Sequence, residues 1–262
     1  MIDDSAIAPA ADELFTAFQK AVPISPLSGR WPDLSIDDAY GIQQRLVGRR
    51  VAGGARVVGK KIGVTSQAVM NALGVNQPDF GILLSDMLFQ RGAEISMASL
   101  IQPKAEGEIA FVLKRDLVGP GLTAVDVLMA TEGVMACFEI VDSRIRDWKI
   151  KIQDTVADNA SCGVFVLSDR LVPIASANLY SCGMVLERNG QIAGVGAGAA
   201  SMGSPVNAVV WLANTLGRLG VPLMAGEVIL SGALSAMVPV QAGDQLHLEI
   251  DGIGDCSVHF TP

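Results

Sequence analysis

The hydrophobic periodicity of the chain changes near residue 105, and this change limits the folds that the chain can adopt. Before that point, apolar residues follow helical spacing, and one stripe consists of Ala11, Leu14, Phe15, Phe18 and Val22. A second helix is predicted from the capping sequence Ser35-Ile-Asp-Asp38 to the Gly53-Gly54 pair. A short third helix is predicted between Ser66, which can cap it, and Gly74, which can close it.

After residue 105 the pattern is that of strands. Short runs rich in β-branched or aromatic residues, bounded by polar residues and glycines, occur at 108–113, 137–141 and 163–167. A helix starting at Thr123 interrupts them. Two hairpins are predicted, 184–188 with 191–195 across Asn189-Gly190, and 245–250 with 256–260 near Asp251-Gly252. Between the hairpins, a helix is predicted to begin at Ser204-Pro205 and end at Gly220.

Helices followed by many strands predict an α+β fold rather than a doubly wound α/β sheet. The sequence shows no linker, internal repeat or low-complexity tract. We therefore divide the chain into an N-terminal helical α/β region (residues 1–75) and a β-rich catalytic domain (residues 76–262), which together form one integrated unit.

Composition excludes several classes of protein. Half of the 262 residues are hydrophobic, but no apolar run approaches the ~20 residues that span a bilayer, so no membrane segment is expected. The acidic N-terminus lacks the features of a signal peptide, which favours a cytoplasmic protein. A net charge of −8 argues against nucleic acid as a partner. The apolar excess is then expected to cover subunit contacts, which predicts a homo-oligomer. The four cysteines have no CxxC spacing and are expected to be core thiols.

Glu106 and Glu108 are the residues that most need a chemical explanation. On a strand, residues i and i+2 point to the same face, so the two carboxylates project together at the start of a strand that enters the core. Burial would increase their mutual repulsion, and a divalent cation would relieve it. Oxygen-only ligation suits Mg²⁺ or Mn²⁺. The alternative is an exposed strand start with two solvated glutamates.

Glu139 lies inside the apolar run Ala-Cys-Phe-Glu-Ile-Val, so it is expected either to have a buried partner or to face a cavity. As a third ligand it would give a triad of charge −3 around the cation. The alternative is a core glutamate paired with an arginine such as Arg144 or Arg146.

Other catalytic schemes lack the necessary residues. The chain has only two histidines, His247 and His259, both in the C-terminal hairpin, so nucleophilic triads have no obvious base. Lys60 and Lys61 precede an Ile-Gly-Val-Thr-Ser segment, which we interpret as a turn into the capped helix. One of them could face the metal site and hold a substrate carboxylate or transfer a proton. The alternative, which the residues alone favour, is two surface lysines.

Five motifs occur in order along the chain: Gly59-Lys-Lys-Ile-Gly-Val-Thr-Ser66, Gln77-Pro-Asp-Phe-Gly81, Pro103-Lys-Ala-Glu-Gly-Glu-Ile-Ala-Phe111, Phe138-Glu-Ile-Val-Asp-Ser143 and Asp158-Asn-Ala-Ser-Cys162. Together they closely resemble the 2-hydroxypenta-2,4-dienoate (2-keto-4-pentenoate) hydratases of aromatic meta-cleavage pathways, within the fumarylacetoacetate hydrolase superfamily. The resemblance covers nearly the whole chain.

This resemblance implies a mixed β-roll or barrel with an N-terminal α/β region, and a homo-oligomer built from pentamers. It implies that Glu106, Glu108 and Glu139 bind Mg²⁺ or Mn²⁺. It also assigns Lys61, in preference to Lys60, as the active-site cation that donates a proton or anchors the substrate carboxylate. Asp79, which could position or deprotonate water, and Ser161 match positions near the substrate pocket.

The implied reaction is metal-dependent hydration of 2-hydroxypenta-2,4-dienoate to 4-hydroxy-2-oxopentanoate. The alternatives are the sister decarboxylase of 2-oxo-3-enedioates (4-oxalocrotonate), a non-catalytic partner subunit in complex with that decarboxylase, and a C–C bond hydrolase. The segment Asp158–Gly163 resembles the hydratases more than the decarboxylases. A hydrolase is disfavoured because the N-terminal half has no histidine to activate water.

Overall fold

A computed structural model describes residues 4–262, and its N-terminal part is helical. The helices here are α1 (Asp4–Lys20), α2 (Leu27–Arg30), α3 (Ile36–Ala52) and α4 (Gln67–Leu73). The predicted capping box at Ser35 is confirmed, because its hydroxyl accepts from the Asp38 backbone and Asp38 accepts from the Ser35 backbone. Val22 does not belong to the first stripe. It lies beyond α1 and is 54 % exposed, because Ala21 adopts a left-handed conformation that ends the helix.

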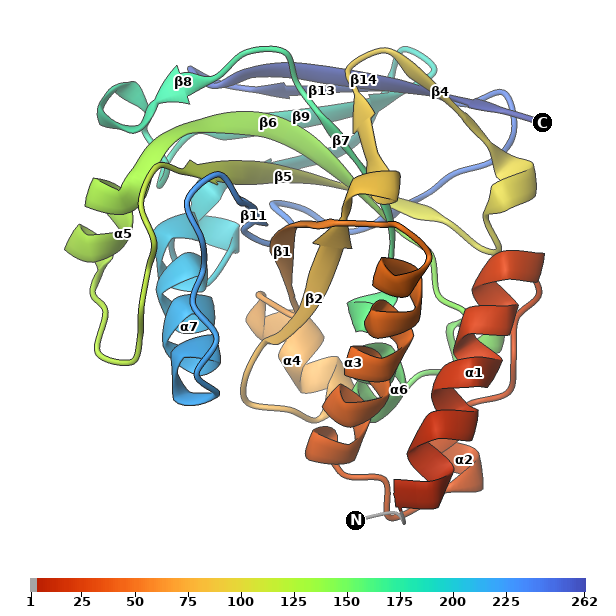
Figure 1. Ribbon diagram of the computed structural model, residues 1–262. Helices are drawn as coiled ribbons and strands as arrows, with labels where there is room; N and C mark the ends of the chain where they lie inside the picture. Colours follow the sequence, from red (N-terminus) through yellow and green to blue (C-terminus); the bar gives the residue numbers. More distant parts are fainter. Residues whose placement is uncertain (1–3) are drawn as a thin grey trace.

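A nine-stranded mixed sheet forms the centre of the molecule (Figure 1). Its main path has the order β2-β1-β11-β5-β6-β7-β3, while β12 pairs with β5 and β8 with β6. The strands are β1 (Val57–Gly63), β2 (Asp79–Leu84), β3 (Leu88–Gln90), β5 (Lys104–Leu113), β6 (Thr131–Val141), β7 (Cys162–Leu167), β8 (Val172–Pro173), β11 (Val228–Leu230) and β12 (Val238–Pro239). The predicted strands at 108–113, 137–141 and 163–167 are confirmed, and each is longer than predicted.

The segment of residues 62–66 was predicted to be a turn into the capped helix, and this is wrong for Ile62 and Gly63, which belong to the strand formed by residues 57–63. This strand is β1, which pairs with β2 on one side and with β11 on the other. This strand contains two lysines and two glycines, residue types that are uncommon in strands, so the sequence pattern does not indicate it. Gly59 is required here, because a Cβ atom would lie 1.8 Å from the carbonyl oxygen of Val228 on the neighbouring strand. Close pairing on both sides therefore decides the conformation.

A second sheet of five strands packs against the first, in the order β10-β9-β13-β14-β4. Its strands are β4 (Ala93–Ser96), β9 (Gly183–Arg188), β10 (Gln191–Ala197), β13 (Gln245–Ile250) and β14 (Gly254–Thr261). Both predicted hairpins are confirmed, and Asn189, Gly190 and Gly252 have the positive φ angles that these turns need. One hydrophobic core joins the sheets, and includes Phe111 and Phe138 from the first with Leu248 and Phe260 from the second.

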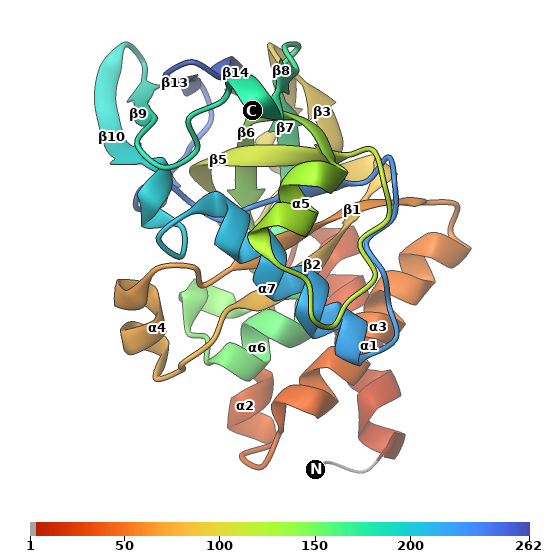
Figure 2. The same cartoon turned by 90° about the vertical axis from the view of Figure 1, so that its left-hand side faces the viewer.

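The remaining helices cover the large sheet. They are α5 (Ala124–Ala130), α6 (Ile152–Ala157) and α7 (Pro205–Arg218). Ser204 takes the N-cap position of α7 as predicted, although its side chain makes no capping hydrogen bond. Helix α6 packs on α2 and α3, and residues of these helices and of α1 form a separate core. Helix α4 lies beside α6 below β2 (Figure 2).

The predicted α+β class is confirmed, and the described residues form two stacked sheets rather than a closed barrel. The proposed boundary at residues 75 and 76 falls between α4 and β2, and β2 pairs with β1 across it. No helix within residues 4–262 has the length and apolar character needed to cross a membrane.

A buried arginine ties the end of β6 to the segment before β7. Arg144 donates through Nε to Asp158 at 2.5 Å and through Nη1 to the carbonyl oxygens of Asp142 and Cys162. This network holds the turn Asn159–Ser161, in which three consecutive non-glycine residues have left-handed φ angles between 51° and 54°. Such backbone is costly and persists only where surrounding contacts fix it.

Replacing Arg144 by Ala should lower the free energy of unfolding by about 3–5 kcal/mol, because it leaves the Asp158 carboxylate buried without its cation. Chemical denaturation measures this loss. The matched change Arg115→Ala, at an exposed position, should alter stability by less than about 0.5 kcal/mol. Equal effects of the two substitutions would contradict the assigned role of Arg144.

Candidate metal centre and substrate cavity

The pairing of β5 with β6 brings the three predicted glutamates together. Glu106 lies opposite Glu139 in the antiparallel register, and Glu108 follows two residues later on the same face of β5. Carboxylate oxygens from the three residues lie within 4.8 Å of one another. Glu108 is 1 % exposed and Glu139 is fully buried. The alternative of two solvated glutamates at an exposed strand start is therefore wrong.

Three oxygens in this cluster lack hydrogen-bond partners among the described residues. They are Oε1 of Glu108 and both carboxylate oxygens of Glu139. The other Glu108 oxygen accepts a 2.8 Å hydrogen bond from the Gly232 backbone. Unsatisfied buried carboxylates are costly unless something neutralises them. Oxygen-only donors at this spacing fit a hard divalent cation such as Mg²⁺, Mn²⁺ or Ca²⁺.

The pKa values of the glutamates also show that burying these carboxylates close together is unfavourable. Burial, followed by the charge of Glu139, raises the pKa of Glu106 to about 8. The same two causes, in the same order, raise the pKa of Glu108 well above its ordinary value. Without a cation, the cluster therefore holds protons near neutral pH, and a bound cation would replace them.

The partner of Glu139 is a lysine and not an arginine. Arg144 is engaged by Asp158, and Arg146 reaches the carbonyl oxygen of Pro23, so the predicted alternative of an arginine partner is wrong. Lys61 Nζ instead lies 3.1 Å from Glu139 Oε1, as an ion pair without hydrogen-bond geometry.

Lys60 and Lys61 point to opposite faces of β1, as neighbouring strand residues do. Both are buried, at 4 % and 3 % exposure, so the alternative of two surface lysines is wrong. Lys61 faces the glutamates, whereas Lys60 forms a buried ion pair with Glu227. The structure thus brings Lys61 to the cluster and leaves Lys60 behind the strand.

Asp79 faces Lys61 across the pair of β1 and β2, where it lies opposite Gly63. A Cβ atom on Gly63 would lie 2.3 Å from Asp79 Oδ1 and 3.3 Å from Lys61 Nζ, so only glycine leaves room for both groups. Burial raises the pKa of Asp79, with Lys61 opposing and Glu139 adding to the rise. Burial lowers the pKa of Lys61, but Glu139 and Asp79 outweigh it and hold the pKa above the ordinary lysine value. Lys61 therefore remains a cation at neutral pH.

A cavity of about 420 Å³ opens onto these groups. Its polar lining includes Lys61, Asp79, Glu106 and Ser161, and the Ser161 hydroxyl lies 3.0 Å from that of Thr155. Its apolar lining comes from separate loops and helices, and includes Val64, Val69, Leu73, Ile150 and Met237. Sequence reasoning did not identify these apolar residues, because no local pattern indicates which loops meet across a cavity.

The two histidines and the four cysteines do not line the substrate cavity. His247 and His259 lie in the second sheet, and His259 Nδ1 is 3.8 Å from Glu94 Oε1. All four cysteines are buried and free, as predicted.

Removal of a glutamate should abolish tight cation binding. Glu106→Gln and Glu139→Gln should each weaken Mn²⁺ binding by more than about 100-fold, the upper range for loss of an outer-shell partner. Calorimetric titration measures this, with the exposed Glu132→Gln as control. Because glutamine has nearly the same size and shape as glutamate, both metal-free variants should remain folded. Near-native affinity in either variant would exclude that residue as a ligand.

Cation affinity should also depend on pH. Below about pH 8 Glu106 holds a proton in the metal-free protein, and this proton must leave before the carboxylate binds the cation. The apparent Mn²⁺ affinity should therefore rise between pH 6.5 and 8.5, by up to about 10-fold per pH unit for each proton released. Titrations in buffers of different ionisation enthalpy measure that release. An affinity independent of pH would contradict the protonated cluster.

Comparison with known proteins places this site in a family. Residues 59–261 match the family model described as Fumarylacetoacetate (FAA) hydrolase C-terminal. The chain is 54 % identical to a 2-hydroxyhexa-2,4-dienoate hydratase of Comamonas testosteroni, over the full length of both. It is 58 % identical to a 2-hydroxypent-2,4-dienoate hydratase of Pseudomonas putida, over 84 % of this chain and all of the relative.

Among solved structures, 4-oxalocrotonate decarboxylase from Pseudomonas putida G7, complexed with magnesium and adipate, superimposes with a TM-score of 0.97. It is 34 % identical and covers 99 % of each chain. Fold, site and sequence thus agree: the chain belongs to the fumarylacetoacetate hydrolase family, in the group that contains the 2-hydroxydienoate (2-keto-4-pentenoate) hydratases.

Proposed function

We propose that this protein is a hydro-lyase that adds water to 2-hydroxypenta-2,4-dienoate or a close homologue, giving a 4-hydroxy-2-oxo acid, in meta-cleavage aromatic catabolism. The relatives named hydratases are 54 % and 58 % identical over most or all of the chain, whereas the structurally similar decarboxylase is 34 % identical. These identities favour hydration over decarboxylation.

The observation that carries the proposal is the charge distribution in the substrate cavity. Among the described residues that line it, Lys61 is the one cation, and it lies beside the glutamate cluster. The lining also includes apolar side chains such as Val69, Leu73 and Met237. A substrate with one carboxylate at the metal end and an apolar tail fits this lining. The second carboxylate of a 2-oxo-3-enedioate would find no second cation among the described residues of this lining, which is unfavourable.

Glu106, Glu108 and Glu139 are proposed to hold Mg²⁺ or Mn²⁺, in agreement with their unpartnered oxygens and with the magnesium in the related decarboxylase structure. When bound, the cation would polarise the 2-oxygen of the substrate and stabilise negative charge on it.

Lys61 and Asp79 are proposed to handle the proton transfers, with Ser161 at the substrate. Because its pKa is raised, Lys61 stays protonated and can anchor a carboxylate or donate a proton, but it is unsuited to act as a base. Loss of the 2-hydroxyl proton and addition of a proton at C5 convert the dienol into the isomeric 2-oxo-3-enoate, to which water adds at C4. Asp79, made more basic by burial, is the candidate that accepts a proton from this water.

The assembly is proposed to be a homo-oligomer built from pentamers that works in the cytoplasm, alone or with the sister decarboxylase. Exposed apolar side chains on the β9–β10 hairpin, including Ile192 and Val195 at 68 % and 64 % exposure, support subunit contacts there.

The purified protein with Mn²⁺ should consume enzymatically generated 2-hydroxypenta-2,4-dienoate and form 4-hydroxy-2-oxopentanoate. Loss of the dienol absorbance follows consumption, and proton NMR identifies the product. Lys61→Ala should reduce turnover by about 100-fold or more, in the range of positioned acid–base groups. Lys60→Ala, which alters the opposite face, should retain far more activity per folded molecule. No consumption, together with release of CO₂ from 2-oxohex-3-enedioate, would identify a decarboxylase instead.

A further inference from the structure

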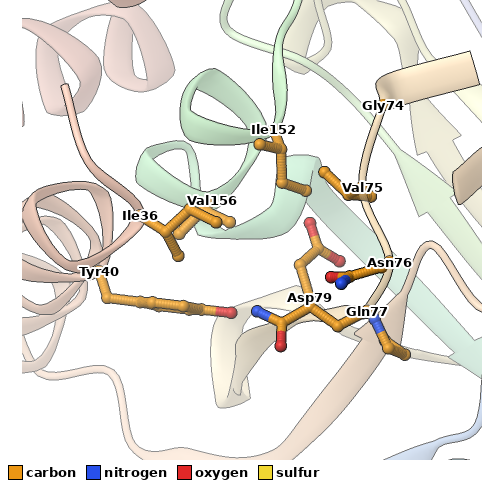
Figure 3. Close-up of a pocket in the computed structure, with 10 residues that line it drawn as sticks. Ile36, Tyr40, Gly74, Val75, Asn76, Gln77, Asp79, Ile152 and Val156 are labelled. Atoms are coloured by element: carbon orange, nitrogen blue, oxygen red, sulfur yellow. The ribbon is translucent and has the colours of Figure 1, made fainter. Parts of the chain in front are cut away.

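Asp79 lines a second cavity, also of about 420 Å³, which shares no other lining residue with the substrate cavity (Figure 3). Its walls come from α3, from the segment between α4 and β2, and from α6. Asn76 and Gln77 are exposed at its outer end, whereas Asp79 is only 2 % exposed. One carboxylate thus separates two cavities that reach it from different parts of the fold.

The Asp79 carboxylate has an unused acceptor. Its Oδ1 atom, which lies beside Gly63 on the side of Lys61, is buried and makes no hydrogen bond within residues 4–262. A buried acceptor of this kind requires a partner, and ordered water commonly supplies it where polar groups and sufficient space are present. The second cavity offers both, since its lining includes Asn76, Gln77 and Tyr40.

Tyr40 is held rigidly along one wall of this cavity. Its ring stacks on Phe80, the residue after Asp79, with centroids 4.4 Å apart and planes 15° from parallel. Figure 3 shows its hydroxyl directed into the cavity, toward the side-chain amide of Gln77, with the Asp79 carboxylate beyond it. Burial, followed by the charge of Asp79, raises the pKa of this hydroxyl above the ordinary tyrosine value. The hydroxyl therefore keeps its proton and can donate a hydrogen bond.

Hydration of a dienoate creates a need for such a second route. The substrate enters the cavity that holds the glutamates and Lys61, so water that follows through the same opening must pass the substrate. Water that arrives through the second cavity does not have to pass the substrate, and it meets the Asp79 carboxylate, the proposed base.

We propose that the second cavity delivers water to Asp79, and that Tyr40 is a positioning residue that orients this water against the carboxylate. This inference rests on the proposed hydratase function. The water oxygen forms the bond to C4 as the C3–C4 π pair moves toward C3 and the 2-oxygen. The water proton passes to Asp79, which then returns it to C3. The net change is the addition of one H₂O, and Asp79 is regenerated.

Two variants test the route separately. Tyr40→Phe keeps the stacked ring and removes the hydroxyl, and Asn76→Trp places a large side chain at the exposed end of the cavity. Controls are Tyr180→Phe, at the other tyrosine of the chain, and Asn71→Trp, at an exposed position on α4. Neither control residue lines either cavity.

Tyr40→Phe should form the 4-hydroxy-2-oxo product about 10-fold more slowly, the effect of losing one ordered hydrogen bond, and Asn76→Trp should also slow its formation by obstructing the cavity. Loss of the dienol absorbance, which reports ketonisation, should remain near the native rate, so the 2-oxo-3-enoate should accumulate in the NMR spectrum. KM and Mn²⁺ affinity should change by less than about 3-fold, and the controls should match the native protein.

Native rates of hydration in both variants would overturn the proposal. Equal slowing of ketonisation and hydration would also overturn it, because this result indicates a structural effect on the whole site. A native protein that consumes no dienol would contradict the hydratase function itself, whatever the variants do.

Discussion

The antiparallel pairing of β5 with β6 places Glu106 opposite Glu139 and concentrates negative charge in the interior of the protein. The rest of the site is arranged around that charge. Lys61 is placed beside Glu139 by a strand paired on both sides, and Asp79 faces Lys61 from the next strand. A divalent cation completes the charge balance, which explains why so many buried carboxylates are tolerated together.

Backbone constraints position the groups that this charge balance needs. Gly63 leaves room for the Asp79 carboxylate next to the Lys61 ammonium, and the left-handed turn at Asn159–Ser161 carries Ser161 to the cavity. Arg144 stabilises this turn through its ion pair with Asp158, the residue before the turn. Strained backbone at the site is therefore held by a buried ion pair outside the cavity.

The same fold supports two reactions, hydration and decarboxylation. The related decarboxylase shares the fold over 99 % of the chain, so architecture alone does not separate the reactions. We propose that the cavity lining separates them, because its single cation, Lys61, and its apolar side chains suit a dienoate with a single carboxylate. The second cavity behind Asp79 provides space for water, the reactant that distinguishes hydration from decarboxylation.

The sequence by itself determined the α+β class, the capped helices, both hairpins and the shared face of Glu106 and Glu108, and its resemblance to the hydratases added Glu139 to this pair. These features depend on local periodicity, on turn residues and on strand alternation. Tertiary structure decided which lysine faces the cluster, because β1 is recognisable as a strand only through its pairing with β2 and β11. It also decided that Arg144 pairs with Asp158 and not Glu139, and that Asp79 borders two cavities. Those contacts join residues far apart in the chain, so no local pattern encodes them.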